Sequence, residues 1–138
     1  MKRITLLLIA TIVLFSANNA FAQDEKEITP EEYAEKQVKT LTTKLELSES
    51  QEFYVDSILT TNFVALKKAI EDLQRSGMQD PQTYRKCNEM WQEKTIAAMK
   101  KVLDEQQFIK YLKYMGKGKE YKKGKDGKYY LKSELKKK

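Results

Sequence analysis

The sequence predicts an all-α protein with four helices, two long and two shorter, followed by a basic tail. Three observations indicate this fold class. Apolar residues recur at three- and four-residue spacing from about residue 30 to residue 115, which is the period of one helix face. A residue that can cap a helix stands at the head of each such segment. No window shows the sustained alternation of apolar and polar residues that is typical of a half-buried strand.

The first 22 residues have the features of a cleavable export signal rather than of a folded element. Lys2 and Arg3 form a positively charged start, and residues 4–15 form an apolar stretch. Ala20-Phe21-Ala22 then matches a small-x-small cleavage site ahead of Gln23. The apolar stretch is shorter than the roughly 20 residues that a membrane-spanning helix needs. We therefore expect a chain from Gln23 onward that is exported to the periplasm, with secretion as the alternative.

Two helices are expected in the first half of the remaining chain. Thr29-Pro30-Glu31-Glu32 predicts the start of the first, because it supplies a cap, a proline at the first helical position and a glutamate at the third. Its apolar stripe comprises Tyr33, Ala34, Val38, Leu41 and Leu45. The second helix is expected to begin after Ser48 and to end at Ser76-Gly77. Its apolar stripe comprises Val55, Ile58, Leu59, Phe63, Leu66, Ile70 and Leu73.

Two further helices are expected before the tail. Asp80-Pro81 predicts the start of the third in the same way as the first. Its apolar side comprises Tyr84, Cys87, Trp91, Ala98 and Val102, with Met90 and Met99 beside them. The fourth helix is expected to begin after Asp104 and to end before Gly116. Its apolar residues are Phe108, Ile109, Tyr111, Leu112 and Met115.

The two middle helices are long for a domain of this size. At roughly 22–27 residues each, they extend about 33–40 Å at 1.5 Å per residue. A compact domain of about 100 residues has a radius of gyration near 13 Å. The long apolar stripes therefore cannot all be buried in one compact monomer. We expect an elongated shape, a dimer or an exposed apolar groove.

One five-residue phrase occurs twice, 56 residues apart, as Leu47-Ser48-Glu49-Ser50-Gln51 and Leu103-Asp104-Glu105-Gln106-Gln107. In each phrase the second residue can accept a hydrogen bond from the N–H of the third helical residue. The glutamine can reach back to the N–H of the cap, which completes a capping box. The predicted helix-capping motif thus comprises Leu47, Ser48, Gln51, Leu103, Asp104 and Gln107.

The two phrases, at the starts of helices in a small exported chain, resemble the LTxxQ family of Spy and CpxP over about residues 30–115. That family consists of bacterial periplasmic chaperones and envelope-stress regulators. The resemblance implies an elongated, curved helical hairpin that forms a dimer of antiparallel subunits, with a concave face that holds unfolded clients without ATP. This chain departs from the family in lacking threonine at the second motif position and a net basic helical body.

Charge divides the chain into an acidic body and a basic tail. Residues 23–112 hold 13 Lys and Arg against 17 Asp and Glu, whereas residues 113–138 hold 11 Lys against three acidic residues. We assign residues 23–115 to the helical domain and residues 116–138 to a tail expected to be flexible, with Asp126-Gly127 as a candidate hairpin turn. Anionic envelope headgroups are a candidate partner of this tail, and no nucleic acid is expected.

Composition argues against catalysis and against a metal or cofactor. The chain has no histidine, which removes the commonest general base and the usual nitrogen ligand of transition metals. Its single cysteine, Cys87, is expected to be buried and inert, with a cross-link between subunits as the alternative. The paired lysines Lys67-Lys68 and Lys100-Lys101 are interpreted as solvated helix faces. We expect no enzyme activity.

The sequence hypothesis is a periplasmic, ATP-independent chaperone-like homodimer of the stress-response type, which binds partly unfolded polypeptides on an apolar concave face. The residues predicted to contact clients are Phe63, Leu66, Ile70, Met90 and Trp91. One alternative is a regulatory module that binds a single partner, such as a sensor-kinase domain. Another is attachment to the envelope through the basic tail.

Overall fold

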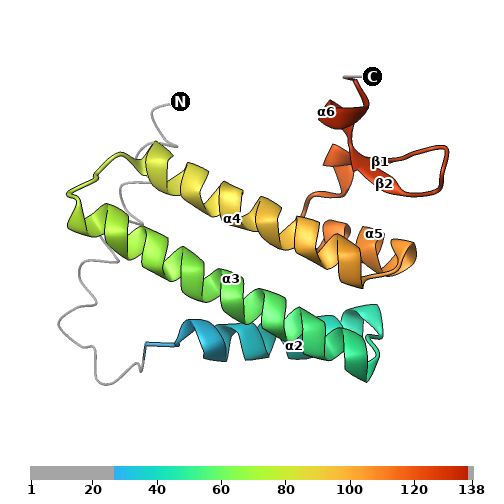
Figure 1. The fold of residues 1–138 in the computed structure, drawn as a ribbon, viewed down its shortest axis with the longest axis horizontal. Helices are drawn as coiled ribbons and strands as arrows, with labels where there is room; N and C mark the ends of the chain where they lie inside the picture. Colours follow the sequence, from blue (N-terminus) through green and yellow to red (C-terminus); the bar gives the residue numbers. More distant parts are fainter. Residues whose placement is uncertain (1–26, 137–138) are drawn as a thin grey trace, which may run out of the picture.

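The structure is a computed structural model that describes residues 27–136 (Figure 1). The predicted export signal and its cleavage site lie outside the described residues. The all-α prediction is confirmed in its main point, because four helices of ten or more residues dominate the described chain and one small two-stranded sheet follows them. None of the described helices is long and apolar enough to cross a membrane.

All four predicted helices are present, and the tail contains four short elements. In chain order the described elements are α2 (Pro30–Leu45), α3 (Glu49–Arg75), α4 (Pro81–Val102), α5 (Glu105–Tyr114), η2 (Gly118–Glu120), β1 (Tyr121–Lys123), β2 (Tyr129–Leu131) and α6 (Lys132–Leu135). The two middle helices are the long ones, with 27 and 22 residues.

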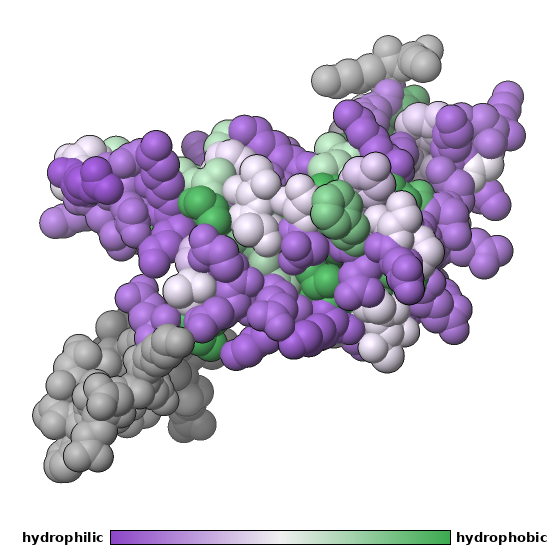
Figure 2. All heavy atoms as spheres, turned by 60° about the horizontal axis from the view of Figure 1, so that its bottom comes forward, coloured by the Kyte–Doolittle hydropathy of each residue, from purple (hydrophilic) through white to green (hydrophobic). Residues whose placement is uncertain are grey.

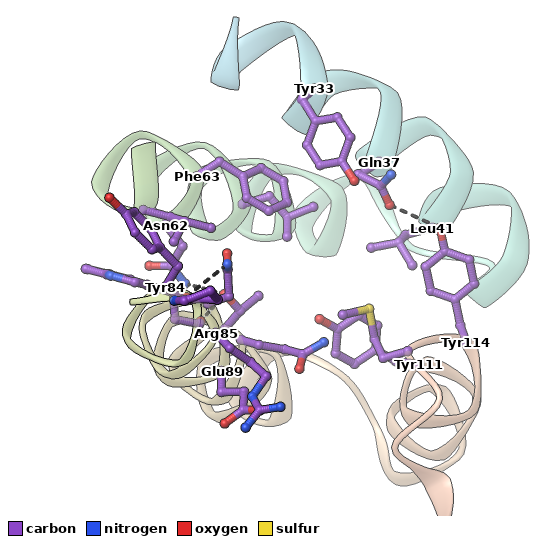
Figure 3. A pocket seen from close by; sticks show the side chains of 18 residues that line it. Tyr33, Gln37, Leu41, Asn62, Phe63, Tyr84, Arg85, Glu89, Tyr111 and Tyr114 are labelled. Atoms are coloured by element: carbon purple, nitrogen blue, oxygen red, sulfur yellow. Dashed lines mark hydrogen bonds and ion pairs between the residues drawn. The ribbon is translucent and has the colours of Figure 1, made fainter. Parts of the chain in front are cut away.

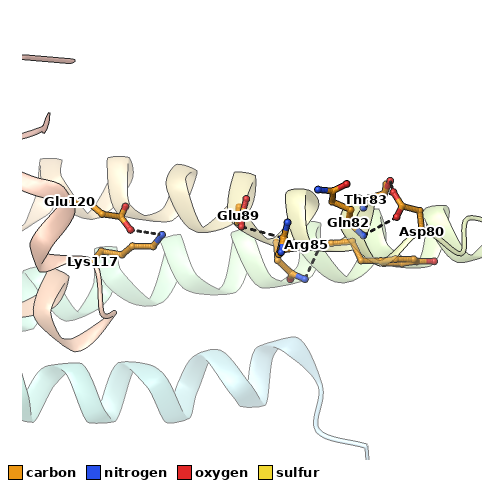
Figure 4. Close-up of polar contacts among 9 residues, drawn as sticks. Asp80, Gln82, Thr83, Arg85, Glu89, Lys117 and Glu120 are labelled. Carbon is orange, nitrogen blue, oxygen red and sulfur yellow. Dashed lines mark hydrogen bonds and ion pairs between the residues drawn. The ribbon is translucent and has the colours of Figure 1, made fainter. Parts of the chain in front are cut away.

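The helices begin where the capping residues predict. Thr29, Ser48 and Asp104 each form a capping box with the third helical residue. Asp80 starts α4 by accepting hydrogen bonds from the backbone N–H groups of Gln82 and Thr83 (Figure 4). A further hydrogen bond from the Thr83 hydroxyl, together with the Gln82 N–H, lowers the pKa of the Asp80 carboxyl.

Glycine ends two of the helices. Gly77 follows α3 and Gly116 follows α5, and both have positive φ angles, 76° and 72°. In each case the next residue returns a hydrogen bond to the helix, from Met78 to the Leu73 carbonyl and from Lys117 to the Leu112 carbonyl. This is the Schellman arrangement, which glycine favours because it has no Cβ to clash in the left-handed conformation.

The four helices form a ring around one interior. α3 and α4 are an antiparallel hairpin, α2 packs along α3, and α5 folds back along α4 (Figure 1). α2 and α5 also touch each other, which closes the ring. The turns α2–α3 and α4–α5 therefore lie together at one end of the long hairpin, while the α3–α4 turn lies at the other end.

The core occupies only the end of the molecule where α2 and α5 meet. The buried apolar residues are Ala34, Val38, Leu41, Leu45, Val55, Leu59, Ile96, Met99, Leu103, Phe108, Tyr111 and Leu112. From Phe63 onward α3 has no buried residue, and α4 has none before Thr95. The predicted stripe of α4 at Tyr84, Cys87 and Trp91 is therefore half-buried, because α5 spans about 15 Å against about 33 Å for α4.

The tail carries an antiparallel hairpin. β1 pairs with β2, and the candidate turn at Asp126-Gly127 lies between them; the flexibility of the tail stays a prediction. Two tyrosines explain how so polar a segment holds a position. Tyr121 packs edge-on against the buried Phe108, with ring centroids 5.8 Å apart, and Tyr129 also packs on the core. Burial raises the pKa of the Tyr121 phenol.

Candidate binding groove and glutamine junction

A groove of about 840 Å³ opens between the helices, and we call it the aromatic groove (Figure 3). Side chains from all four helices converge on it. They are Tyr33, Gln37, Leu41, Leu59, Asn62, Phe63, Leu66, Pro81, Tyr84, Arg85, Asn88, Glu89, Trp91, Gln92, Thr95, Tyr111, Tyr114 and Met115. The groove exists because α5 ends at Tyr114, so nothing in the described chain fills the space between α2 and the first half of α4.

Aromatic side chains dominate the rim and floor of the groove. Tyr33 is 47% exposed and meets Phe63 edge to face, with ring centroids 4.9 Å apart. Trp91 and Tyr114 contribute from α4 and α5. The floor is buried at Tyr111, where desolvation raises the pKa of the phenol. Exposed aromatic rings beside a buried floor suit the binding of apolar side chains.

The aromatic groove carries no net charge. Among its described lining residues the charged side chains are Arg85 and Glu89, one turn apart on α4. Arg85 Nε lies 3.8 Å from Glu89 Oε1, so the two form an ion pair (Figure 4). A ligand in this groove therefore meets little net electrostatic field.

Side-chain amides supply the polar contacts of the groove. Gln37 accepts a hydrogen bond from the Tyr114 hydroxyl at 3.1 Å, and Asn62 donates one to the Thr95 hydroxyl at 2.9 Å (Figure 3). Asn88 donates to the Tyr84 carbonyl, whereas Gln92 has no hydrogen-bond partner among residues 27–136. The Gln37 amino group and the carbonyl oxygens of both asparagines are likewise without a described partner. Donors and acceptors of this kind match the backbone of a polypeptide.

A second hollow of about 540 Å³ continues the apolar surface along α3, and we call it the flanking hollow. It shares Tyr33, Phe63 and Leu66 with the aromatic groove and adds Ile70. The residues just before α2 form its other wall. On the face seen in Figure 2, apolar areas are small and set among hydrophilic side chains.

The structure brings together four of the five residues predicted to contact clients. Phe63, Leu66 and Trp91 line the aromatic groove, and Ile70 lines the flanking hollow. Met90 lines neither and is 45% exposed, because successive helix residues point about 100° apart.

Sequence reasoning missed the tyrosines that α2 and α5 contribute to the groove. Tyr33, Gln37 and Leu41 recur every four residues on α2 and form one stripe, which is the signal that could have found them. Tyr114 gives no comparable signal. Its position depends on where α5 folds back.

The two motif glutamines meet at the opposite end from the α3–α4 turn, in what we call the glutamine junction. Each first completes its own cap. Ser48 N–H donates to Gln51 Oε1 at 3.1 Å, and Asp104 N–H donates to Gln107 Oε1 at 3.1 Å. In return, Ser48 Oγ accepts a hydrogen bond from the backbone N–H of Gln51 at 3.2 Å, and Asp104 Oδ1 accepts one from the backbone N–H of Gln107 at 2.8 Å. Both predicted capping boxes are therefore present.

Each glutamine then binds the other motif. Gln51 Nε2 donates to Gln107 Oε1 at 2.7 Å, and Gln107 Nε2 donates to Gln51 Oε1 at 3.0 Å. Gln51 Nε2 also donates to the carbonyl of Val102, and Gln107 Nε2 to that of Leu45, both at 3.2 Å. These carbonyls are the last of α4 and α2, where no intrahelical donor remains.

The junction therefore uses the full hydrogen-bonding capacity of both side-chain amides, two donors and two acceptors each. Four helix ends are tied at one point by two residues 56 positions apart. Leu103 is buried beside it and Leu47 packs on the same core. The junction fixes the closed end of the aromatic groove, since it sets how α2 and α5 leave the long hairpin.

Metal-ligating side chains do not gather at any point of the described chain. Residues 27–136 contain no cluster of three or more His, Cys, Asp or Glu side chains placed to hold a metal ion. Cys87 is a free, half-buried thiol. Comparison with known proteins finds no matching family model, no curated relative and no similar solved structure.

Proposed function

We propose that this protein is a nucleotide-independent, chaperone-like binding protein of the periplasm, which holds partly unfolded polypeptide in the aromatic groove. The observation that carries the proposal is an open groove lined by tyrosine, phenylalanine and tryptophan, with one internal ion pair as its charge. The mutual contact of the motif glutamines adds support for the resemblance to the LTxxQ family of Spy and CpxP, because it gives both motifs one shared purpose.

Binding would combine two kinds of contact. Aromatic rings at Tyr33, Phe63 and Trp91 take apolar side chains of the client, while the unpartnered amide groups meet its backbone. Neither contact depends on a particular client sequence. Capture is expected to be weak and reversible, since an unfolded segment loses conformational entropy when it is held.

The groove differs from the basic concave face of the family. Because Arg85 and Glu89 neutralise each other, selection by charge is not expected here. Client binding should therefore change less than about twofold between about 50 and 500 mM NaCl, a range over which exposed charge contacts are strongly screened. A homodimer and a curved shape stay predictions. A second copy could cover the half-buried stripes of α3 and α4.

Trp91 provides a direct test, because it is the single tryptophan of the chain and lines the groove. The chain from Gln23 is titrated with a Trp-free, chemically unfolded client, and a saturable change in Trp91 emission is expected. The same preparation should suppress aggregation of two unrelated denatured clients, measured by light scattering without nucleotide. Suppression of neither client at tenfold excess would contradict the proposal.

Two control measurements distinguish the alternative functions from client binding. If one envelope protein alone changes Trp91 emission, the protein is a single-partner regulator rather than a chaperone. If Trp91 emission shifts on dilution without any client, the groove is a contact between copies of the chain. Both outcomes would remove the groove as a client site while leaving the helical fold in place.

A further inference from the structure

The C-terminal hairpin presents a basic surface that the aromatic groove does not use. Four lysines follow its two strands and the turn between them, and all are exposed. We call them the rim lysines; they are Lys122, Lys123, Lys125 and Lys128. We propose that this rim docks the protein on an anionic phospholipid surface.

The rim keeps a net positive charge, because residues 121–131 hold four lysines against one carboxylate, Asp126. None of the rim lysines forms an ion pair with another described residue. Glu120 pairs with Lys117 (Figure 4). Asp126, in the turn of the hairpin, accepts hydrogen bonds from the Tyr130 hydroxyl and from the backbone N–H of Lys128. Those two bonds lower the pKa of the Asp126 carboxyl. The rim therefore has free positive charge for a partner.

The lysines are held in place rather than carried on a loose tail. Lys100 on α4 donates a hydrogen bond to the Tyr129 carbonyl and lies 4.4 Å from the centre of the Tyr130 ring. The Tyr129 N–H donates to Glu105 on α5 at 3.2 Å. Because the hairpin contacts two helices, it presents its lysines to a charged surface with less ordering cost than lysines on a mobile segment.

Charge is also distributed so that one orientation is favoured. Residues 113–136 hold nine lysines and three acidic residues, whereas residues 27–112 hold 12 Lys and Arg against 15 Asp and Glu. An anionic surface attracts the hairpin end and repels the helical body. Among residues 116–136 none lines the aromatic groove, so docking through the rim leaves that groove accessible.

Lipid headgroups fit the rim better than nucleic acid does. Binding of single strands depends on aromatic rings that are free to stack on bases. Here Tyr121 packs on Phe108, Tyr129 packs on the core, and the Tyr130 ring lies under the Lys100 ammonium. The rim thus offers point charges without a stacking platform, which matches phosphate headgroups spread over a plane.

Co-sedimentation with vesicles tests the proposal. The chain from Gln23 is mixed with phosphatidylcholine vesicles with or without about 30% phosphatidylglycerol; the leader is omitted because its apolar stretch would itself bind lipid. Changing all rim lysines to glutamine should lower partitioning onto anionic vesicles by at least about tenfold. Raising NaCl from about 50 to 500 mM should lower it comparably.

A matched variant removes the same charge elsewhere. It changes four exposed helix lysines to glutamine, namely Lys36, Lys39, Lys68 and Lys86. Its partitioning should fall less than threefold if the rim is the docking surface. Equal loss in the two variants would reduce the effect to net charge and overturn the proposal. Retention of vesicle binding by the rim variant, or preference for single-stranded RNA over anionic vesicles, would overturn it as well.

Discussion

The aromatic groove contains one ion pair, Arg85–Glu89, whereas the hairpin rim carries four exposed lysines without an ion-pair partner among residues 27–136. The groove is a concave space of about 840 Å³ between helices, and the rim is a projecting edge of two short strands. The groove is suited to apolar and backbone contacts, whose strength changes little with salt concentration. The rim is suited to contacts between charges, which salt weakens.

The contrast shows how a small chain can separate two kinds of recognition. Both regions depend on α5, whose inner side supplies Tyr111 and Tyr114 to the groove and whose Phe108 supports the hairpin. α5 is held by the glutamine junction at its start. A change at the junction should therefore disturb both regions, and a change in either region should leave the other intact.

The largest effect is expected from Gln107→Glu. Glutamate can still accept from the Asp104 N–H, but it cannot donate to Gln51 Oε1 or to the Leu45 carbonyl, and its charge faces both oxygens. The free energy of unfolding should fall by about 2–4 kcal/mol. Urea denaturation followed by circular dichroism measures this, and both client binding and vesicle binding should weaken in the same variant.

Glu32→Gln is the matched control, since Glu32 holds the same third helical position in the capping box of α2. Glutamine keeps the bond that Glu32 accepts from the Thr29 N–H, so the free energy of unfolding should fall by less than it does in Gln107→Glu. A loss in the control as large as that of Gln107→Glu would show that the exchange between amide and carboxylate at the third helical position, and not the contact between the motifs, accounts for the effect.

An intermediate effect is expected at the groove from Tyr33→Ala. Tyr33 and Tyr54 are both exposed and each meets a phenylalanine edge to face, but Tyr54 pairs with Phe53 outside the groove. Tyr33→Ala should weaken client binding about three- to tenfold, whereas Tyr54→Ala should leave it unchanged. Trp91 fluorescence titration compares them, and equal weakening by both would mean that exposed aromatic content, not the groove, captures clients.

The smallest effect is expected from Lys100→Met, which sharpens the comparison from the hairpin side. Methionine keeps the apolar stem but loses the bond to the Tyr129 carbonyl and the contact with the Tyr130 ring. The hairpin should lose about 1 kcal/mol of local stability. Hydrogen exchange should rise in residues 121–131 and stay unchanged in α2 and α3, while client binding is retained. Unchanged exchange in the hairpin would contradict this role of Lys100.

Local rules explain what the sequence predicts correctly. Short polar residues satisfy helix N–H groups within a few positions, so the starts of the four main helices could be predicted from the sequence. These residues are Thr29, Ser48, Asp80 and Asp104. The ends at Ser76-Gly77 and Gly116 follow from glycine in the same way. The unburied half of the long helices could be anticipated from their length alone.

Contacts between segments far apart in the chain could not be predicted from the sequence. The pairing of Gln51 with Gln107 depends on two turns meeting in space, and each capping box is complete without it. Lys100 was interpreted as part of a solvated helix face, yet it binds the hairpin, because nothing local to α4 indicates that Tyr129 returns to it. The contact of Tyr121 with Phe108 likewise depends on the core that α5 presents.

The position of Gly116 has a consequence for how much the molecule can hold. Each further turn of α5 would add about 5.4 Å and carry side chains into the space now open between α2 and α4. The volume of the groove thus depends on where α5 ends. A change of length just before this glycine would change the volume of the groove, while the lining residues from α2, α3 and α4 would stay in place.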